Sequence, residues 1–272
     1  MNPAALFGPF TPKGLEEALL PAVSEAGAAA LAIYQSDFEV ERKADSSPVT
    51  GADRKAEAIL SAALGEIRPR LPIIAEEAVS AGEIPDVSRV PAFWLVDPVD
   101  GTKEFVGRTG EWTLNIGLVV KGRAIFGIIF APVTGELYVG ALGYGAWRQI
   151  GAGPRVNISA RRPPREGLSV IVSRRHGDDE KVTSLLSGKL INEQVTSGSS
   201  LKFCRIAEGR ADVYPRFGPT SEWDTCAGHA ILEAAGGSVV QADTDRRLAY
   251  AKRRDFLNPP FVAWGVRGRK VV

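Results

Sequence analysis

Residues 94–105 read Trp-Leu-Val-Asp-Pro-Val-Asp-Gly-Thr-Lys-Glu-Phe and follow the apolar Phe93. The apolar start predicts a buried strand, and Asp-Pro-Val-Asp-Gly predicts a sharp turn at its end, with a helix beginning near Gly101. The turn presents the carboxylates of Asp97 and Asp100 together. Carboxylate oxygens bind hard cations such as Mg²⁺, and the backbone N–H groups at a helix start bind phosphate. The stretch therefore predicts metal-assisted hydrolysis of a phosphate ester.

An ordinary turn is the alternative interpretation of this stretch, because Asp, Pro and Gly are common turn residues. Further acidic residues at the ends of expected elements favour the metal site: Asp53, Glu76 and Asp224. Taken singly, Asp53 and Asp224 could be helix caps, and Glu76 could be a solvated surface residue. Taken together, such like charges raise each other's pKa, and a bound dication removes that cost.

The chain alternates between helical and extended patterns. Helices are expected over residues 14–34, 50–64, 179–186, 200–208 and 222–235. Strands are expected over residues 71–74, 113–120, 124–130, 136–140, 145–147, 168–172, 211–214 and 238–240, and a polar loop over 42–50. This interleaving predicts a layered α/β architecture. The Gly-, Pro- and Arg-rich stretch 151–167 predicts a boundary between an α+β domain, 1–155, and an α/β domain, 156–272.

The overall composition excludes several classes of partner. The 272 residues include 33 Lys+Arg and 32 Asp+Glu, so nothing in the overall charge indicates a nucleic-acid or membrane-surface partner, and peripheral association with a membrane stays open. No apolar run reaches the roughly 18–20 residues of a membrane span. The absence of a signal-peptide pattern and the two cysteines predict a cytoplasmic protein with reduced thiols. Zinc is not expected, because the two histidines, His176 and His229, lie far apart in the chain.

Four segments identify a resemblance to a known family. Ser-Pro-Val-Thr-Gly-Ala-Asp (47–53), Ala-Glu-Glu (75–77), the stretch 94–105 and Trp-Asp-Thr-Cys-Ala-Gly-His-Ala (223–230) occur in the order of the inositol monophosphatase superfamily. The chain resembles this superfamily from about Leu15 to Val262. The resemblance implies a layered α/β/α/β/α sandwich and a phosphatase that uses two or more Mg²⁺ per active site. It also implies sensitivity to lithium.

The resemblance also implies a role for individual residues. Those that match metal ligands are Glu76, Asp97, the carbonyl of Val99, Asp100 and Asp224. Asp53 and Thr102 match the pair that activates the attacking water. Gly101 and Thr102 match contacts to the phosphate.

Other motifs resemble one branch of the superfamily, the 3′(2′),5′-bisphosphate nucleotidases. They are Asp-Gly-Thr-Lys-Glu-Phe (100–105), Gly-Ser-Ser-Leu-Lys-Phe-Cys (198–204) and Tyr-Pro-Arg-Phe-Gly-Pro-Thr (214–220). This resemblance implies hydrolysis of the 3′-phosphate of 3′-phosphoadenosine 5′-phosphate to AMP and phosphate. The further residues expected to contact the substrate are Ser173, His176, Gly198, Ser199, Lys202 and Arg216.

Two alternatives stay open at this level. An inositol-1-phosphate or fructose-1,6-bisphosphate phosphatase would share all the metal residues. A non-catalytic sensor of nucleotides or metals could use the same scaffold, although loss of a ligand would favour it and none is lost here. A homodimer is one possible assembly.

Overall fold

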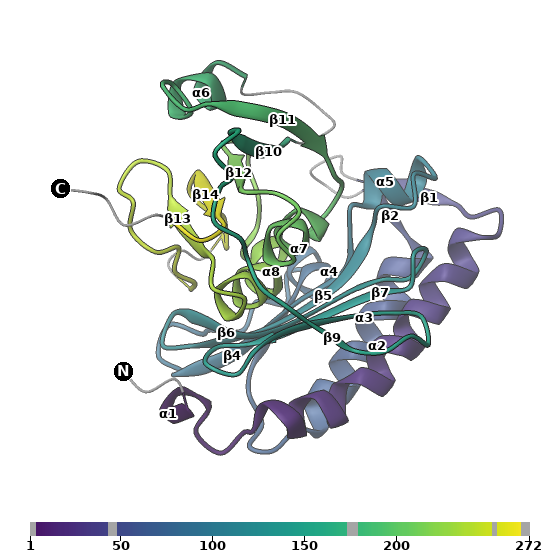
Figure 1. Ribbon diagram of the computed structural model, residues 1–272. Helices are drawn as coiled ribbons and strands as arrows, with labels where there is room; N and C mark the ends of the chain where they lie inside the picture. Colours follow the sequence, from purple (N-terminus) through teal and green to yellow (C-terminus); the bar gives the residue numbers. More distant parts are fainter. Residues whose placement is uncertain (1–3, 43–47, 173–178, 252–254, 268–272) are drawn as a thin grey trace.

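The computed structural model describes residues 4–42, 48–172, 179–251 and 255–267. Two sheets and the helices beside and between them form the layers α/β/α/β/α (Figure 1). The helices are α1 (Ala4–Phe7), α2 (Pro12–Tyr34), α3 (Gly51–Glu66), α4 (Glu76–Ser80), α5 (Thr102–Val106), α6 (Asp179–Leu185), α7 (Leu201–Ala207) and α8 (Glu222–Ala234). The layered fold expected from the sequence is confirmed.

Two groups of strands make up the sheets. Those of the first half are β1 (Val40–Arg42), β2 (Pro48–Thr50), β3 (Ile73–Ala75), β4 (Ala92–Asp100), β5 (Thr113–Val120), β6 (Arg123–Ala131), β7 (Glu136–Ala141), β8 (Gly145–Ile150) and β9 (Val156–Ile158). Those of the second half are β10 (Leu168–Val172), β11 (Ile191–Thr196), β12 (Val213–Arg216), β13 (Ser238–Gln241) and β14 (Phe261–Trp264).

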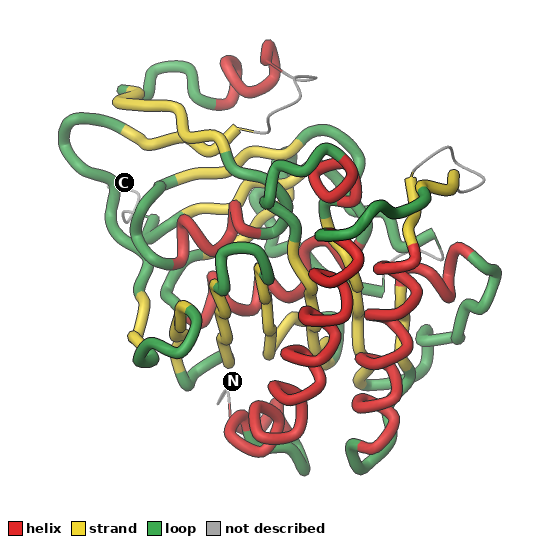
Figure 2. The backbone as a smooth tube through the Cα atoms, turned by 90° about the vertical axis from the view of Figure 1, so that its right-hand side faces the viewer, coloured by secondary structure: helices red, strands yellow, loops and turns green. Residues whose placement is uncertain are grey.

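The larger sheet has seven strands in the order β3-β4-β5-β6-β7-β8-β9 and is antiparallel except for the pair β3–β4. Helices α2 and α3 lie side by side on one of its faces (Figure 2). Strand β4 is buried on both faces: Trp94 and Val96 join the core with α2 and α3, whereas Phe93 and Leu95 join the core with α8. This explains why its sequence is continuously apolar rather than alternating.

The smaller sheet has five strands in the order β11-β10-β12-β14-β13. Strand β10 runs parallel to β11 and β12, whereas β14 is antiparallel to β12 and β13. Its outer face packs against α6 through Val182 and Leu185. Helices α7 and α8 fill the space between the two sheets (Figure 1).

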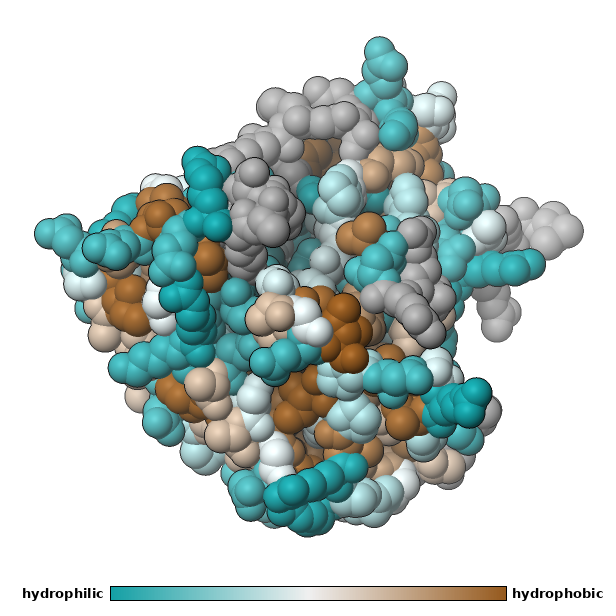
Figure 3. All heavy atoms as spheres, turned by 180° about the vertical axis from the view of Figure 1, so that it is seen from behind, coloured by the Kyte–Doolittle hydropathy of each residue, from teal (hydrophilic) through white to brown (hydrophobic). Residues whose placement is uncertain are grey.

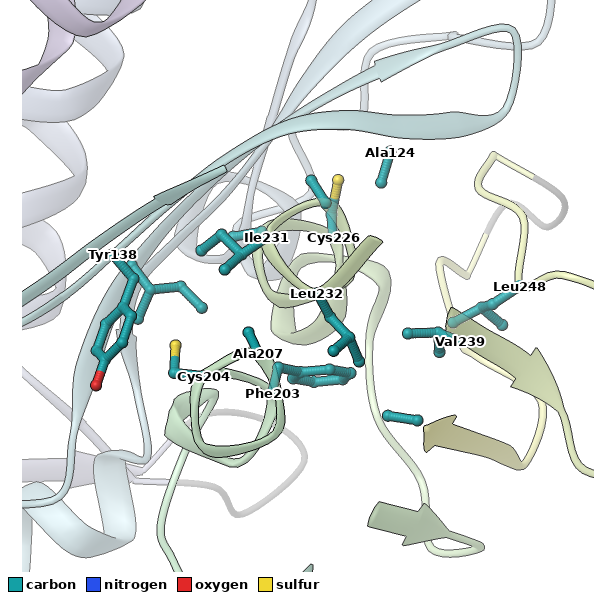
Figure 4. Packing of buried hydrophobic residues seen from close by; sticks show 14 of the residues in the cluster. Ala124, Tyr138, Phe203, Cys204, Ala207, Cys226, Ile231, Leu232, Val239 and Leu248 are labelled. Carbon is teal, nitrogen blue, oxygen red and sulfur yellow. The ribbon is translucent and has the colours of Figure 1, made fainter. Parts of the chain in front are cut away.

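Helix α8 lies with its backbone close against the larger sheet. A Cβ on Gly127 of β6 would stand 2.3 Å from the carbonyl oxygen of Ala227, so only glycine permits this approach. Cys226 and Ile231 lie on the side of α8 toward the larger sheet, and Leu232 lies near Phe203 of α7 (Figure 4). This close packing places the first turn of α8, which carries Asp224, beside the ends of β4 and β5.

Several details differ from the sequence-based expectation. Residues 40–42 and 48–50 pair as the antiparallel strands β1 and β2, although a polar loop was expected over 42–50. Strands β9, β11 and β14 were not expected. The larger sheet continues through β9, and the first strand of the smaller sheet begins at Leu168. The domain boundary between residues 155 and 156 stays a prediction.

Helix α2 has 23 residues and a hydropathy of 1.2, which by length and composition alone would suffice to cross a membrane. Core helices of soluble proteins meet the same criterion, and Leu15, Leu19 and Val23 of α2 are buried in the core shared with α3. Seen from behind, the surface shows hydrophobic residues in separate groups among hydrophilic ones (Figure 3). The cytoplasmic location stays a prediction.

Candidate active site

A bulge in β4 brings Asp97 and Asp100 to the same side of the strand. Asp97 pairs with Asn115 and Asp100 pairs with Thr113, so two residues of β4 lie opposite a single residue of β5. Without the bulge, residues three apart would point to opposite faces. Pro98 lies within the bulge, where its missing N–H removes no ladder hydrogen bond. The expected sharp turn is therefore a distortion within the strand itself.

The two oxygens of the Asp53 carboxylate face different partners. The backbone N–H and the hydroxyl of Thr50 both donate to Oδ2 at 2.8 Å, which completes a capping box at the start of α3. The other oxygen, Oδ1, lies 3.5 Å from the hydroxyl of Thr102. That hydroxyl also lies 3.2 Å from the carbonyl oxygen of Val99. Asp53 therefore caps a helix and faces Thr102 at the same time.

Gly101 connects the bulged strand to the short helix α5. Its φ of +86° lies in the left-handed region that favours glycine. A Cβ at this position would also lie 3.4 Å from the Cβ of Ser199, a residue of the C-terminal half. The helix expected after Gly101 is confirmed, and its start lies next to the segment that precedes α7.

Four carboxyl groups from three elements gather at the end of β4. Burial raises the pKa of Asp97 well above its usual range, and the nearby charges of Glu76, Asp100 and Asp224 raise it further. Burial likewise raises the pKa of Asp224, and so do Asp100 and Glu76. The backbone N–H of Ser221 donates to the Asp224 carboxylate at 2.8 Å and opposes this shift. The site therefore gathers three half-buried acidic residues around the buried Asp97.

The donor chemistry of this cluster fits Mg²⁺, which prefers carboxylate and carbonyl oxygens and offsets the repulsion between buried carboxylates. Glu76, Asp97, Asp100 and Asp224 supply carboxylates, and the carbonyl of Val99, which stands between Asp97 and Asp100 in the chain, lies 3.2 Å from the Thr102 hydroxyl. Within the described ranges, no three His, Cys, Asp or Glu side chains are already arranged as a metal-binding group.

A polar network from the C-terminal half reaches Asp100. The hydroxyls of Ser199 and Ser200 donate to its Oδ2 at 2.8 Å and 2.6 Å. The amide of Asn115 donates to the Ser200 hydroxyl at 2.9 Å, and this hydroxyl lies 2.8 Å from the carbonyl oxygen of Asp224. Sequence reasoning missed Asn115 and the contact of the Ser200 hydroxyl with Asp100. The available signal was Asn115 itself, a polar side chain within an otherwise apolar strand.

A cavity of about 250 Å³ adjoins the carboxyl cluster and is lined by Gly198, Ser199, Lys202 and Arg216 as well as Asp100 and Asp224. Lys202 is buried, its ammonium donates to the Ser199 carbonyl at 2.7 Å, and burial lowers its pKa. Arg216 donates to the carbonyl of Pro219 at 3.1 Å. Two cationic side chains therefore line the same cavity as the acidic residues.

The sequence pattern of the inositol monophosphatase family matches residues 13–263. The chain belongs to the inositol monophosphatase family. It is 44% identical over 240 residues to the 3′(2′),5′-bisphosphate nucleotidase CysQ of Salmonella typhimurium, covering 87% of this chain and 94% of that protein. The corresponding Escherichia coli K12 protein is 42% identical, with the same coverage.

Solved structures of the family agree. The crystal structure of CysQ from Bacteroides thetaiotaomicron has a TM-score of 0.78 and 39% identity, covering 93% of this chain and 97% of that one. The structure of inositol monophosphatase from Anabaena has a TM-score of 0.72 and 26% identity, covering 93% and 91% of the two chains. The family resemblance stated from the motifs is confirmed.

The expected site residues of this inositol monophosphatase family member fall into three groups. Those gathered at the end of β4 are Asp53, Glu76, Asp97, Val99, Asp100, Gly101, Thr102 and Asp224. Those that line the adjoining cavity are Gly198, Ser199, Lys202 and Arg216. Ser173 and His176 lie outside the described residues. The structure thus brings the first two groups together, while the role of each residue stays a prediction.

Proposed function

We propose that this protein hydrolyses the 3′-phosphate of 3′-phosphoadenosine 5′-phosphate to AMP and phosphate in a Mg²⁺-dependent reaction. The observation that carries this proposal is the position of the carboxyl cluster around Asp97 beside a cavity lined by Lys202 and Arg216. A bisphosphate needs both features, since one phosphate is held for hydrolysis and the other needs cationic partners. The similarity to CysQ proteins, at 42–44% identity over most of the chain, supports the same choice of substrate.

Asp53 and Thr102 would accept the proton of the attacking water. The Thr102 hydroxyl lies between the Val99 carbonyl and Oδ1 of Asp53, so it can donate to the carboxylate while its own oxygen accepts from water. Thr50 donates twice to Oδ2 and thereby holds the carboxylate with Oδ1 toward Thr102. The proton therefore has a defined path from the water through Thr102 toward Asp53.

Bound Mg²⁺ would supply the positive charge that neutralises the phosphate and makes the water acidic. The residues that would hold two or more such ions are Glu76, Asp97, the carbonyl of Val99, Asp100 and Asp224. Ser199 and Ser200 would orient the Asp100 carboxylate by donating to a single one of its oxygens, Oδ2. Gly101 would let the backbone N–H groups at the start of α5 approach the phosphate.

The other phosphate would lie against the cationic part of the cavity. The Lys202 ammonium would hold it as a buried point charge, and the Arg216 guanidinium would offer two parallel donors. The carbonyl of Ser199 fixes the Lys202 ammonium, so little side-chain entropy is lost when the anion binds.

Turnover with matched substrates tests the proposal. The purified full chain with Mg²⁺ should release phosphate from 3′-phosphoadenosine 5′-phosphate with a higher kcat/KM than from inositol 1-phosphate or fructose 1,6-bisphosphate. A chelator should abolish the release, and added Mg²⁺ should restore it. A preference for inositol 1-phosphate would overturn the choice of substrate. Tight nucleotide binding without turnover would instead indicate a sensor.

A further inference from the structure

Glu57 is a buried carboxylate on α3 that lies one turn after Asp53, with 9% of its surface exposed. Its two oxygens accept hydrogen bonds from the backbone of another element. The N–H of Glu77 donates to Oε2 at 2.7 Å, and the N–H of Ala78 donates to Oε1 at 2.9 Å. Glu57 thus contacts the second and third residues of α4.

Helix α4 begins without a cap of its own. Its N-cap residue is Ala75, which has no side-chain hydrogen bond to offer. The first N–H groups of any helix lack partners inside the helix, and a buried one must find an acceptor elsewhere. Glu57 supplies that acceptor from α3, with a negative charge that also suits the positive end of a helix.

Glu76 is the first residue of this short helix and a proposed metal ligand. We propose that Glu57 is a positioning residue, which fixes the first turn of α4 and thereby sets the Glu76 carboxylate for Mg²⁺. The inference rests on the proposed metal-dependent function. A ligand must be held close to its productive geometry, and the residues that hold it affect metal affinity without touching the metal.

The spacing of Asp53 and Glu57 gives α3 two roles in the site. Residues four apart on a helix lie on the same face, so one face of α3 carries both the carboxylate that reaches Thr102 and the carboxylate that reaches α4. Asp53 faces Thr102, and Glu57 holds the helix that carries Glu76. A single rigid helix therefore places the proton acceptor and orients a metal ligand.

Metal binding by the full chain tests this role without relying on activity. The chelator-treated wild type, Glu57→Gln and Leu60→Ala are titrated with Mg²⁺ in a calorimeter. In Glu57→Gln, one carboxylate oxygen becomes an NH₂ group that faces an N–H donor, so Mg²⁺ affinity should fall by about tenfold or more. Leu60 is buried on the same helix, so Leu60→Ala should lower the Tm and leave the Mg²⁺ affinity unchanged.

The kinetic readout separates positioning from catalysis. Glu57→Gln should need a higher Mg²⁺ concentration for half-maximal turnover, while kcat at saturating Mg²⁺ approaches that of the wild type. If Glu57→Gln does not fold, Glu57→Asp carries the same comparison, because it keeps the charge but is one methylene too short to reach both N–H groups.

Two results would overturn the role of Glu57. One is Mg²⁺ affinity equal to that of the wild type in the Glu57 variant. The other is an equal loss of affinity in Leu60→Ala, which would show an effect of stability alone. If the wild type itself binds no Mg²⁺, the proposed function fails instead, so the two failures are distinguishable.

Discussion

At the scale of single residues, the site gives one carboxylate two partners. Asp53 completes the capping box of α3 through Oδ2 and faces Thr102 through Oδ1. The helix-cap interpretation and the proton-acceptor interpretation, which compete in the sequence, are therefore compatible in the structure. Asp224 shows the same combination, since it accepts from the N–H of Ser221 and also belongs to the carboxyl cluster.

The first prediction separates these two functions of Asp53. Asp53→Ala should keep substrate binding and lower kcat by about 10²–10⁴-fold, because a general base is lost. Thr50→Ala should cost about 1 kcal/mol of stability, as the loss of an N-cap does, and lower kcat much less than Asp53→Ala, because the backbone N–H of residue 50 still donates to Oδ2. Steady-state kinetics and thermal unfolding check both. Unchanged turnover in Asp53→Ala would remove this residue from the proton path.

The second prediction concerns pH and follows from the raised pKa values of Asp97 and Asp224. A carboxyl with a higher pKa in the folded chain binds its proton more tightly there. Without metal, these two groups therefore lose their contribution to stability as the pH rises from the usual Asp pKa through the raised values. Mg²⁺ requires the deprotonated carboxylates, so it should raise the Tm more at about pH 8 than at about pH 5.5. An equal increase at both pH values would contradict this.

At the scale of elements, the position of α8 depends on a glycine of the sheet. Gly127→Ala would drive a methyl group into the Ala227 carbonyl, so we expect a loss of about 1–3 kcal/mol or more and weaker Mg²⁺ binding as Asp224 moves. Gly65→Ala on α3 is the control, since its Cβ meets no atom within 4 Å and alanine favours the helix. Urea denaturation and Mg²⁺ titration measure both effects. Equal stability of the two variants would refute the role of Gly127.

The predicted helices and strands agree with the structure where the residue pattern is strong and local. The helices α2, α3 and α8 have clear apolar faces, and α3 begins with Thr50, a good N-cap. Strand β11 was missed because Ile-Asn-Glu-Gln-Val-Thr is polar and exposed at a sheet edge, where no core demands an apolar side. The bulge in β4 was also not foreseen, because it is defined by the register with β5.

At the scale of the whole molecule, the candidate site joins the two sheets. Strand β4 of the larger sheet carries Asp97 and Asp100, whereas the segment before α7 carries Ser199 and Ser200, which donate to Asp100. The cavity that holds Lys202 lies at this junction. The proposed recognition of a second phosphate would therefore depend on how the two halves pack together.

A prediction about Lys202 follows from this arrangement. Lys202→Met should lower kcat/KM for 3′-phosphoadenosine 5′-phosphate by about 10–100-fold, as expected for a lost hydrogen bond to a charged group. A substrate with one phosphate should be affected much less. Lys189→Met, an exposed lysine outside this cavity, serves as the charge-matched control. An equal loss for both substrates would place Lys202 in the structure of the site rather than in recognition of the second phosphate.

The sequence alone predicted the reaction class and the layered fold, and it named the acidic residues that lie together at the end of β4. These predictions rest on local patterns, because a turn, a helix cap or an apolar strand is specified by a few neighbouring residues. Only the tertiary structure decided how the acids converge. The bulge turns Asp97 and Asp100 to one side, the packing at Gly127 brings Asp224 to them, and Glu57 holds the start of α4. Each of these depends on contacts between segments far apart in the chain, which no local pattern specifies.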